Sequence, residues 1–430
     1  MMSPRHAKSS ARSADLFVET PSPISGDRIE FACRLVEPQS TRRLWFRFPQ
    51  ASASKLTARA DPFVLATLVY ALGRIDRLHV HGTISDGLFA NLADFQDAFS
   101  SFQRRAPAPI EFSADEIAPA PRRAPESGGI TAFSGGVDSC FSAFRHTPLS
   151  SLTPKRPLRA ALMMHGFDIP LADEATFERA ATRSRRMIDD AGLAFFTGAS
   201  NLRELPVPWE KTFAAAVAAS LSFFQPAFAF GLVPSCHDWT HSHFENGSNP
   251  VTDPLLSSFA YQIIHDGTRY GRIEKLRHLG EWPAALRDVR VCWQGHQLDR
   301  NCCRCEKCLR TMLMLRVAGV TDAPAFPEPI DLRSVERVTI KSKGGLDEFS
   351  YLLSEARRLG VNEPWIAPAE RALRRNRRRQ FWANGVRAVA AKLPPGLRKV
   401  VAGSVRGLRG QTNPSAPAAP LARTLPSHSS

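Results

Sequence analysis

The sequence reads Ser134-Gly135-Gly136-Val137-Asp138-Ser139 between an apolar run at 130–133 and a segment at 140–145 that can form a helix. Two adjacent glycines let the backbone turn with its N–H groups inward, and the N-terminus of the following helix adds partial positive charge. The hydroxyls of Ser134 and Ser139 can donate to phosphate oxygens. Asp138 would be repelled by bare phosphate, so we expect it to bind or orient Mg²⁺, or to accept backbone N–H bonds. The stretch predicts a strand, a pyrophosphate-binding loop and a helix.

Apolar and amphipathic segments alternate downstream of this loop. Apolar runs predict strands at 158–164, 194–197 and 227–233, and helices are expected at 173–191 and 212–224. This alternation predicts an α/β fold with a Rossmann-like parallel sheet and right-handed crossovers, in which ligands bind at the carboxyl ends of the strands.

Five of the eight cysteines fall within seventeen residues. Cys292, Cys302, Cys305 and Cys308 have the spacing of a tetrahedral Zn²⁺ site, in which a CxxCxxC knuckle is closed by an upstream thiolate. Four protein ligands leave no position for water, so the metal would be structural. Iron–sulfur ligation is the alternative, and Cys303 is interpreted as a spare or alternate ligand.

The SGGVDS loop resembles that of the PP-loop ATP pyrophosphatase superfamily (adenine nucleotide alpha hydrolase-like), whose signature SGGxDS follows the first strand of a HUP-type sheet. The resemblance implies that ATP is cleaved between its α and β phosphates and that the substrate is carried as an adenylate. It assigns residues 134–139 to ATP binding and, within them, Asp138 and Ser139 to catalysis.

Loop and cysteines together are similar to the 7-cyano-7-deazaguanine synthase family, which converts a carboxylate to an amide and then to a nitrile. The family's zinc ligands carry over to Cys292, Cys302, Cys305 and Cys308, and the likeness covers about residues 128–320. We therefore expect an AMP-forming, C–N bond-forming ligase with ATP, Mg²⁺ and Zn²⁺ as cofactors. A small-molecule carboxylate and ammonia would be its substrates.

Composition shifts predict the domain organisation. We expect a disordered start at 1–14, an α+β N-terminal domain at 15–103, a proline-rich linker at 104–127 and the ATP-binding domain with its zinc knuckle at 128–320. A helical extension would follow at 321–370, and then a basic, partly disordered tail at 371–430.

The positive charge of the chain belongs to its tail. The formal net charge is +15, but residues 371–430 hold thirteen Lys or Arg and no Asp or Glu, which leaves +2 for the rest. Nucleic acid or an anionic membrane is therefore a hypothesis about the tail only. The uncharged run 212–236 contains two prolines and a glycine and is interpreted as helix, turn and strand, so no transmembrane span is expected. Clustered cysteines and the lack of a secretory signal favour a reducing cytoplasm.

Two other functions fit parts of the sequence. A tRNA-modifying PP-loop enzyme, which thiolates or aminates an adenylated base, would explain the basic tail, and a non-catalytic zinc-stabilised nucleic-acid-binding protein is a third possibility. Arg272 and Lys275 could meet phosphate, but their i, i+3 spacing is interpreted, by a slight preference, as a solvated helix face.

Overall fold

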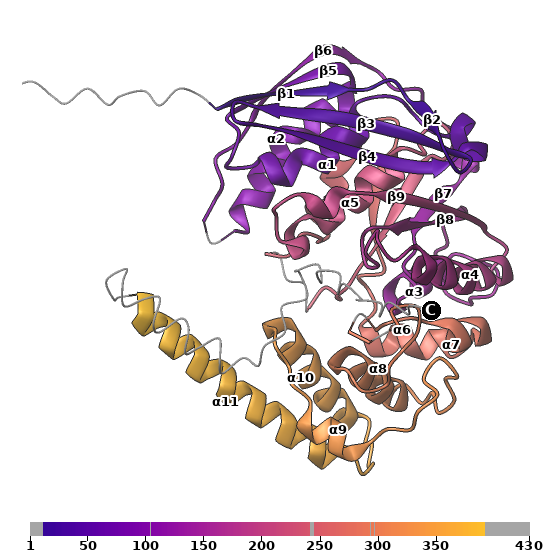
Figure 1. The fold of residues 1–430 in the computed structure, drawn as a ribbon. Helices are drawn as coiled ribbons and strands as arrows, with labels where there is room; N and C mark the ends of the chain where they lie inside the picture. The colour runs from indigo at the N-terminus through magenta and orange to yellow at the C-terminus, as the bar shows by residue number, and fades with distance from the viewer. Residues whose placement is uncertain (1–11, 104, 241–244, 293, 296, 392–430) are drawn as a thin grey trace, which may run out of the picture.

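The computed structural model describes residues 12–103, 105–240, 245–292, 294–295 and 297–391 (Figure 1). Its strands are β1 (Ser13–Val18), β2 (Ser22–Ile24), β3 (Arg28–Glu37), β4 (Ser40–Pro49), β5 (Arg77–Ser85), β6 (Glu111–Ala118), β7 (Gly129–Ala132), β8 (Leu158–His165), β9 (Ala194–Ser200), β10 (Phe230–Pro234) and β11 (Gln262–Asp266). Within the described residues these strands form one sheet in the order β11-β10-β7-β8-β9-β4-β3-β1-β5-β6, with β2 beside β3.

The helices are α1 (Asp61–Ala71), α2 (Asp86–Ser101), α3 (Val137–Arg145), α4 (Glu174–Asp190), α5 (Trp209–Ser222), α6 (Arg272–Leu279), α7 (Pro283–Asp288), α8 (Glu306–Val317), α9 (Leu332–Arg337), α10 (Lys343–Arg358) and α11 (Ile366–Ala391). Short 3₁₀ turns lie at Gln50–Lys55, Pro125–Ser127, Leu202–Glu204 and Asp253–Leu256. Local capping defines several of these helices; Asp173, for example, accepts the N–H of Thr176 at 3.3 Å at the start of α4.

The central part of the sheet is parallel. β11, β10, β7, β8 and β9 all run in one direction, which confirms the predicted α/β class with a mostly parallel sheet. Alternate residues of β8 enter different cores, since Ala161 packs with α3 and α4 while Ala160 and Leu162 pack with α1 and α5. Helices therefore cover both faces, and the carboxyl ends of β7, β8 and β10 open toward one edge.

The N-terminal strands continue the same sheet. β4 pairs antiparallel with β9 through Phe46 with Ser200 and Arg47 with Ala199. The side chain of Asn201 reinforces this seam, because its Oδ1 accepts the N–H of Trp45 at 2.9 Å and its Nδ2 donates to the carbonyl of Arg43 at 3.0 Å. Segments 15–103 and 128–320 thus share one sheet, although the domain boundaries themselves stay predictions.

The segment expected to be a linker contains a strand. β6 lies within 104–127 and pairs parallel with β5. Its side chains alternate between a partly covered face, with Phe112 and Ala114, and an exposed face, with Glu111, Ser113 and Asp115. Prolines lie on both sides of this period-2 pattern and hide it in the sequence, so residues 111–118 of the expected linker are a paired strand.

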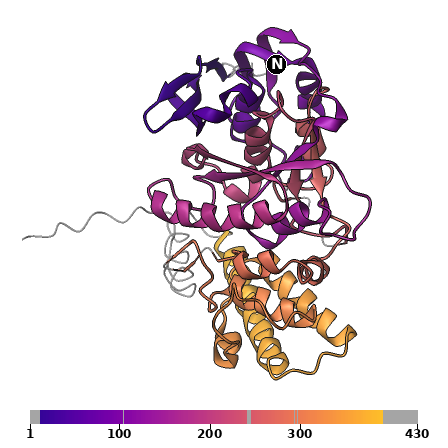
Figure 2. The same ribbon diagram turned by 90° about the vertical axis from the view of Figure 1, so that its right-hand side faces the viewer.

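The C-terminal helices form a separate layer below the sheet, as Figures 1 and 2 show in orange and yellow. α9 and α10 fall in the predicted helical extension, and α11 packs against both. α11 continues to Ala391, so the first third of the segment predicted as a partly disordered tail is helical. Residues 392–430 and 1–11 lie outside the described residues. None of the helices that the structure describes combines the length and the apolar composition needed to cross a membrane.

Phe223 joins the two halves of the molecule. This fully buried residue caps the C-terminus of α5, and its ring lies 4.8–5.6 Å from four rings of the N-terminal segment: Phe31, Phe46, Phe48 and Phe63. We expect Phe223→Ala to lower the free energy of unfolding by about 3–5 kcal/mol, because a cavity would remain where these rings meet. Denaturant titration measures this change. Phe381→Ala, which removes an exposed ring, is the control, and a loss below about 1 kcal/mol for Phe223→Ala would contradict the expectation.

Candidate functional site

The loop between β7 and α3 is closed by its own serines. Gly135 has φ 75°, a left-handed conformation that favours glycine. The hydroxyl of Ser139 accepts the N–H of Ser134 at 3.2 Å and donates to the carbonyl of Gly136 at 3.0 Å. Gly136 is the N-cap residue of α3, so the first N–H groups of the helix have no intrahelical acceptor. A loop of this form can hold an anion at the helix N-terminus.

Arg290 holds this loop from the C-terminal side. Its backbone N–H donates to the carbonyl of Gly135 at 2.7 Å, and its guanidinium donates to the carbonyl of Ser134 at 3.0 Å. The same guanidinium also donates to the carbonyl of Leu298 at 3.1 Å and to a carboxylate oxygen of Asp168 at 3.4 Å. The sequence analysis did not identify Arg290 as a residue of the site. The only feature that could have drawn attention to it is its position two residues before the predicted metal ligand Cys292.

Asp138 is paired with two cations from α6. Its Oδ2 lies 2.8 Å from the guanidinium of Arg272, and its Oδ1 lies 3.1 Å from Nζ of Lys275. The side chain of Lys275 is only 1 % exposed and that of Arg272 is 14 % exposed. The preference for a solvated helix face was therefore wrong: the i, i+3 pair points inward, to the SGGVDS loop.

The ion pairs with Arg272 and Lys275 keep the Asp138 carboxyl ionised. Burial alone would raise the pKa of the Asp138 carboxyl, but the positive charges of Arg272 and Lys275 outweigh burial and lower it. Asp138 in turn raises the pKa of Arg272 against the opposing effect of burial. The carboxylate thus stays ionised and fixes two cations beside the N-terminus of α3.

A cavity of about 700 Å³ opens beside the loop, at the carboxyl ends of β7, β8 and β10. Ser134, Gly136, Val137, Asp138 and Ser139 form part of its wall, and Cys292 borders it from the other side. Its charged lining comprises four cations and three carboxylates: Arg203, Arg272, Arg290, Lys307, Asp138, Asp168 and Glu210. Aromatic and aliphatic side chains complete the wall, among them Phe133, Met163, Met164, Phe167, Phe213 and Val217. The cavity thus has the size and mixed lining of a small-molecule site.

Some of the polar residues that follow the parallel strands line the cavity, and others are buried away from it. Asp168 and Arg203 line the cavity. His165 does not, because it is buried with Nε2 2.8 Å from the carbonyl of Pro170 and its ring stacked on Phe177. Cys140 is also a core residue, and burial raises the pKa of its thiol.

The four predicted cysteines come together at the start of α8. Their sulfur atoms all lie within 4.8 Å of one another, with Cys292 3.7 Å from Cys305 and Cys302 3.9 Å from Cys308. The backbone N–H groups of Cys305 and Cys308 donate to the sulfurs of Cys302 and Cys305, at 3.3 and 3.4 Å. Such N–H donors favour thiolates, so the cluster could bind a metal.

The sulfur spacing fits zinc. A Zn–S bond of about 2.3 Å in a regular tetrahedron places the sulfurs about 3.8 Å apart, close to both of the distances given above. Cys292 and Cys308 are buried, and Cys302 and Cys305 are partly buried. Cys303 has φ 58° and lies outside the group of four, with its sulfur 4.0 Å from the carbonyl of Asn301.

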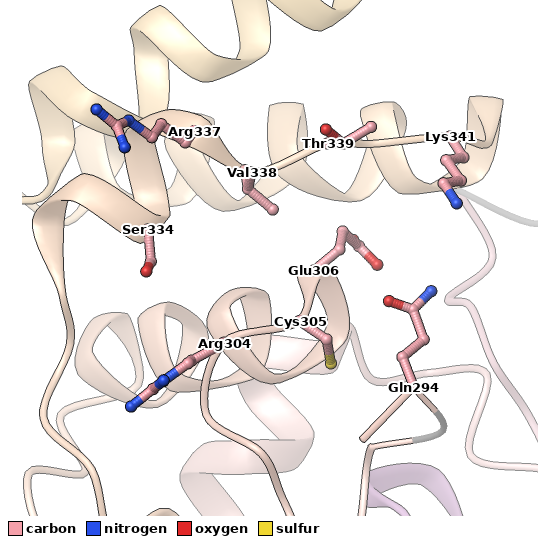
Figure 3. A pocket seen from close by; sticks show the side chains of 9 residues that line it. All are labelled: Gln294, Arg304, Cys305, Glu306, Ser334, Arg337, Val338, Thr339 and Lys341. Carbon is pink, nitrogen blue, oxygen red and sulfur yellow. The ribbon is translucent and has the colours of Figure 1, made fainter. Parts of the chain in front are cut away.

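A smaller, open cavity of about 330 Å³ lies next to Cys305. Figure 3 shows Arg304, Cys305 and Glu306 on one side of it and the segment from Ser334 to Lys341 on the other. α8, which begins at the cysteine cluster, contacts α10 of the helical extension. A metal in the cluster would therefore support the α8–α10 contact as well as its own loop.

No family model, no curated protein and no solved structure matches this chain. Functional conclusions therefore depend on the loop, the cavity and the cysteine cluster themselves.

Proposed function

We propose that the chain is an ATP-dependent ligase of the PP-loop ATP pyrophosphatase type, which adenylates a carboxylate, releases pyrophosphate and transfers a nitrogen nucleophile. The observation that carries this proposal is the SGGVDS loop at the N-terminus of α3, which opens onto a cavity of about 700 Å³ at the carboxyl ends of parallel strands. Helix N–H groups suit the phosphates. The apolar wall of the cavity suits a purine base and an acid of similar size.

The chemistry requires two displacements. A carboxylate oxygen attacks the α-phosphorus of ATP, the bond from this phosphorus to the bridging oxygen breaks, and pyrophosphate leaves with the electron pair. Ammonia then attacks the acyl carbon, AMP leaves, and the nitrogen loses a proton to give the amide. Arg272, which lines the cavity and is held by Asp138, stands close enough to the loop to stabilise negative charge on the departing pyrophosphate. Lys275 lies behind it, where its Nζ is bonded to Asp138 and to the carbonyl and hydroxyl of Ser235.

This arrangement changes the role that we assign to Asp138. Both of its oxygens are engaged by cations, so the residues described at 134–139 offer no free carboxylate to Mg²⁺. Asp138 instead acts as a positioning residue for Arg272 and Lys275. The donor set of Cys292, Cys302, Cys305 and Cys308 does fit Zn²⁺, which would stabilise the wall of the cavity without an open coordination position.

Pyrophosphate release tests the proposal. The purified full chain is given ATP and Mg²⁺ with a panel of carboxylates that includes 7-carboxy-7-deazaguanine, with and without ammonia. We expect release with one acid of the panel and a loss of at least about 100-fold in Arg272→Met, because Arg272 lines the cavity beside the loop and one preorganised donor contributes about that much. Asp189→Asn, which alters an exposed carboxylate on α4 away from the cavity, is the matched control. Equal release by Arg272→Met and the wild type would contradict the proposed site.

A tRNA acceptor is the second candidate, because α11 carries a suitable surface. Arg374, Arg377, Arg378 and Arg379 are exposed on this helix, and the nearby rings of Phe381 and Trp382 are 76 % and 71 % exposed. Cations with exposed aromatic rings can bind phosphates and stack on bases. Pyrophosphate release that requires tRNA, and no small acid, would favour this candidate over the first.

A further inference from the structure

The outer face of β5 and β6 carries a cluster of histidines and carboxylates that the proposed function does not use. His79 and His81 alternate with the buried residues Leu78 and Val80, so both imidazoles lie on the same, partly exposed face of the sheet. Asp115 of β6 lies on this face too. One potential ligand atom from each of His79, His81 and Asp115 lies within 4.8 Å of the other two.

A β-bulge sets the position of Asp115. The parallel register of β5 and β6 pairs Val80 with Ala114 and then Thr83 with Glu116, so His81 and Gly82 together oppose Asp115. As a result, one oxygen of Asp115 faces both imidazoles, at 2.9 Å from Nε2 of His79 and 3.4 Å from Nδ1 of His81. A metal about 2.1 Å from each ligand, at angles of about 90–110°, requires ligand separations of about 3.0–3.4 Å.

The remaining ring nitrogens have their own partners. Nδ1 of His79 lies 2.8 Å from the hydroxyl of Ser113, and Nε2 of His81 lies 3.1 Å from Oδ1 of Asp15 on β1. The ring of Phe17 stacks on His81 with centroids 4.1 Å apart and an interplanar angle of 6°. Metal-binding histidines are usually oriented in this way, by a carboxylate or hydroxyl on the nitrogen that faces away from the metal.

His81 also faces more acceptors than a neutral ring can satisfy. Carboxylate oxygens lie near both of its nitrogens, but a neutral imidazole has a single N–H. If the N–H donates to Asp15, Nδ1 has a lone pair directed at Asp115, and a cation between the two would remove their repulsion. A divalent ion at this point would balance the two carboxylates, Asp15 and Asp115.

We infer that His79, His81 and Asp115 form a binding site for a divalent transition-metal ion on the outer face of the sheet, separate from the cysteine cluster. Two imidazoles and one carboxylate suit Zn²⁺, Co²⁺ or Ni²⁺ and disfavour Mg²⁺ and Ca²⁺, which prefer oxygen ligands. Side-chain exposures of 32–53 % leave room for water or an anion at the other coordination positions.

Cobalt binding tests this site on the full chain. The cysteine cluster is first saturated with Zn²⁺, weakly held ions are removed by brief dialysis against a chelator, and Co²⁺ is titrated by calorimetry and absorption. We expect one further equivalent of Co²⁺, whose spectrum shows ligand-field bands without thiolate charge-transfer bands. This spectrum separates the new site from exchange into the cysteines.

Matched variants locate the binding. His81→Ala and the isosteric Asp115→Asn should each weaken Co²⁺ binding by at least about tenfold. Asp15→Asn should weaken it by about tenfold, because Asp15 orients the ring of His81. Glu111→Gln, on the same face of β6 but paired with Arg77, should leave binding unchanged. The inference fails if no further equivalent binds, if the bound Co²⁺ shows thiolate bands, or if His81→Ala and Asp115→Asn bind as tightly as the wild type.

Discussion

Replacing Cys308 with serine is expected to release the metal of the cysteine cluster and to unfold the layer formed by α8–α10. Cys308 is fully buried, and its sulfur completes the group of four within 4.8 Å. The free energy of metal binding at structural zinc sites is about 10–16 kcal/mol in small peptides, which is comparable to the whole stability of a domain, about 5–15 kcal/mol. Metal analysis and thermal unfolding of the purified variant measure both effects.

Cys303→Ser is the matched control for this prediction. Cys303 is also buried and is separated from Cys308 by only four residues, but its sulfur lies outside the group of four. We therefore expect this variant to retain its metal and to unfold near the wild-type temperature. Equal metal loss in both variants would show that the ligand set is wrong, and full metal content in Cys308→Ser would show that this cysteine is not a ligand.

Asp138→Ala should be the most damaging single change at the SGGVDS loop. It leaves Arg272 and Lys275 close together without the carboxylate that pairs with both, and Lys275 is only 1 % exposed. Removal of one partner from such a buried pair costs about 3–5 kcal/mol. Denaturant unfolding measures the loss. In a double-mutant cycle, Lys275→Met should partly rescue Asp138→Ala, whereas additive losses would mean that the two side chains do not interact.

Acid titration gives an independent test of the same pair. The folded-state pKa of Asp138 lies below its ordinary value, so its contribution to stability is present above about pH 4 and is lost as the pH falls from there through the folded-state pKa. The difference in unfolding free energy between the wild type and Asp138→Asn should therefore shrink as the pH is lowered below about 4. A constant difference across this range would contradict the assigned ion pairs.

The parallel part of the fold could be predicted because its signals are local. The strand expected at 158–164 is β8 at Leu158–His165, and the helix expected at 173–191 is α4 at Glu174–Asp190. Each of these two predictions depends on a contiguous segment of sequence: an apolar run for the strand, and an amphipathic pattern with an N-cap residue for the helix. The pairing of β4 with β9 has no such signal, since the partners lie far apart in the chain and only Phe46 and Arg47 enter the ladder.

The sequence pointed to the residues of the candidate site, but only to some of the residues that surround them. The SGGVDS loop and the four cysteines were found from spacing, and the structure places the loop and one of these cysteines, Cys292, on the border of one cavity. Helical spacing predicted that Arg272 and Lys275 share a face, but it could not show that Asp138 covers that face. Arg290 was missed because its closest contact with the loop uses a backbone N–H, which every residue except proline possesses.

The seam between β4 and β9 also constrains the order of events during synthesis. β4 leaves the ribosome long before Ala199 and Ser200, so its edge has no partner while the intervening chain is translated. An open, aromatic-rich edge invites pairing between nascent chains, and charged side chains along the strand oppose it. Arg43 and Arg47, which flank Trp45 and pair with Glu30 in the folded protein, are placed to protect this edge until β9 arrives.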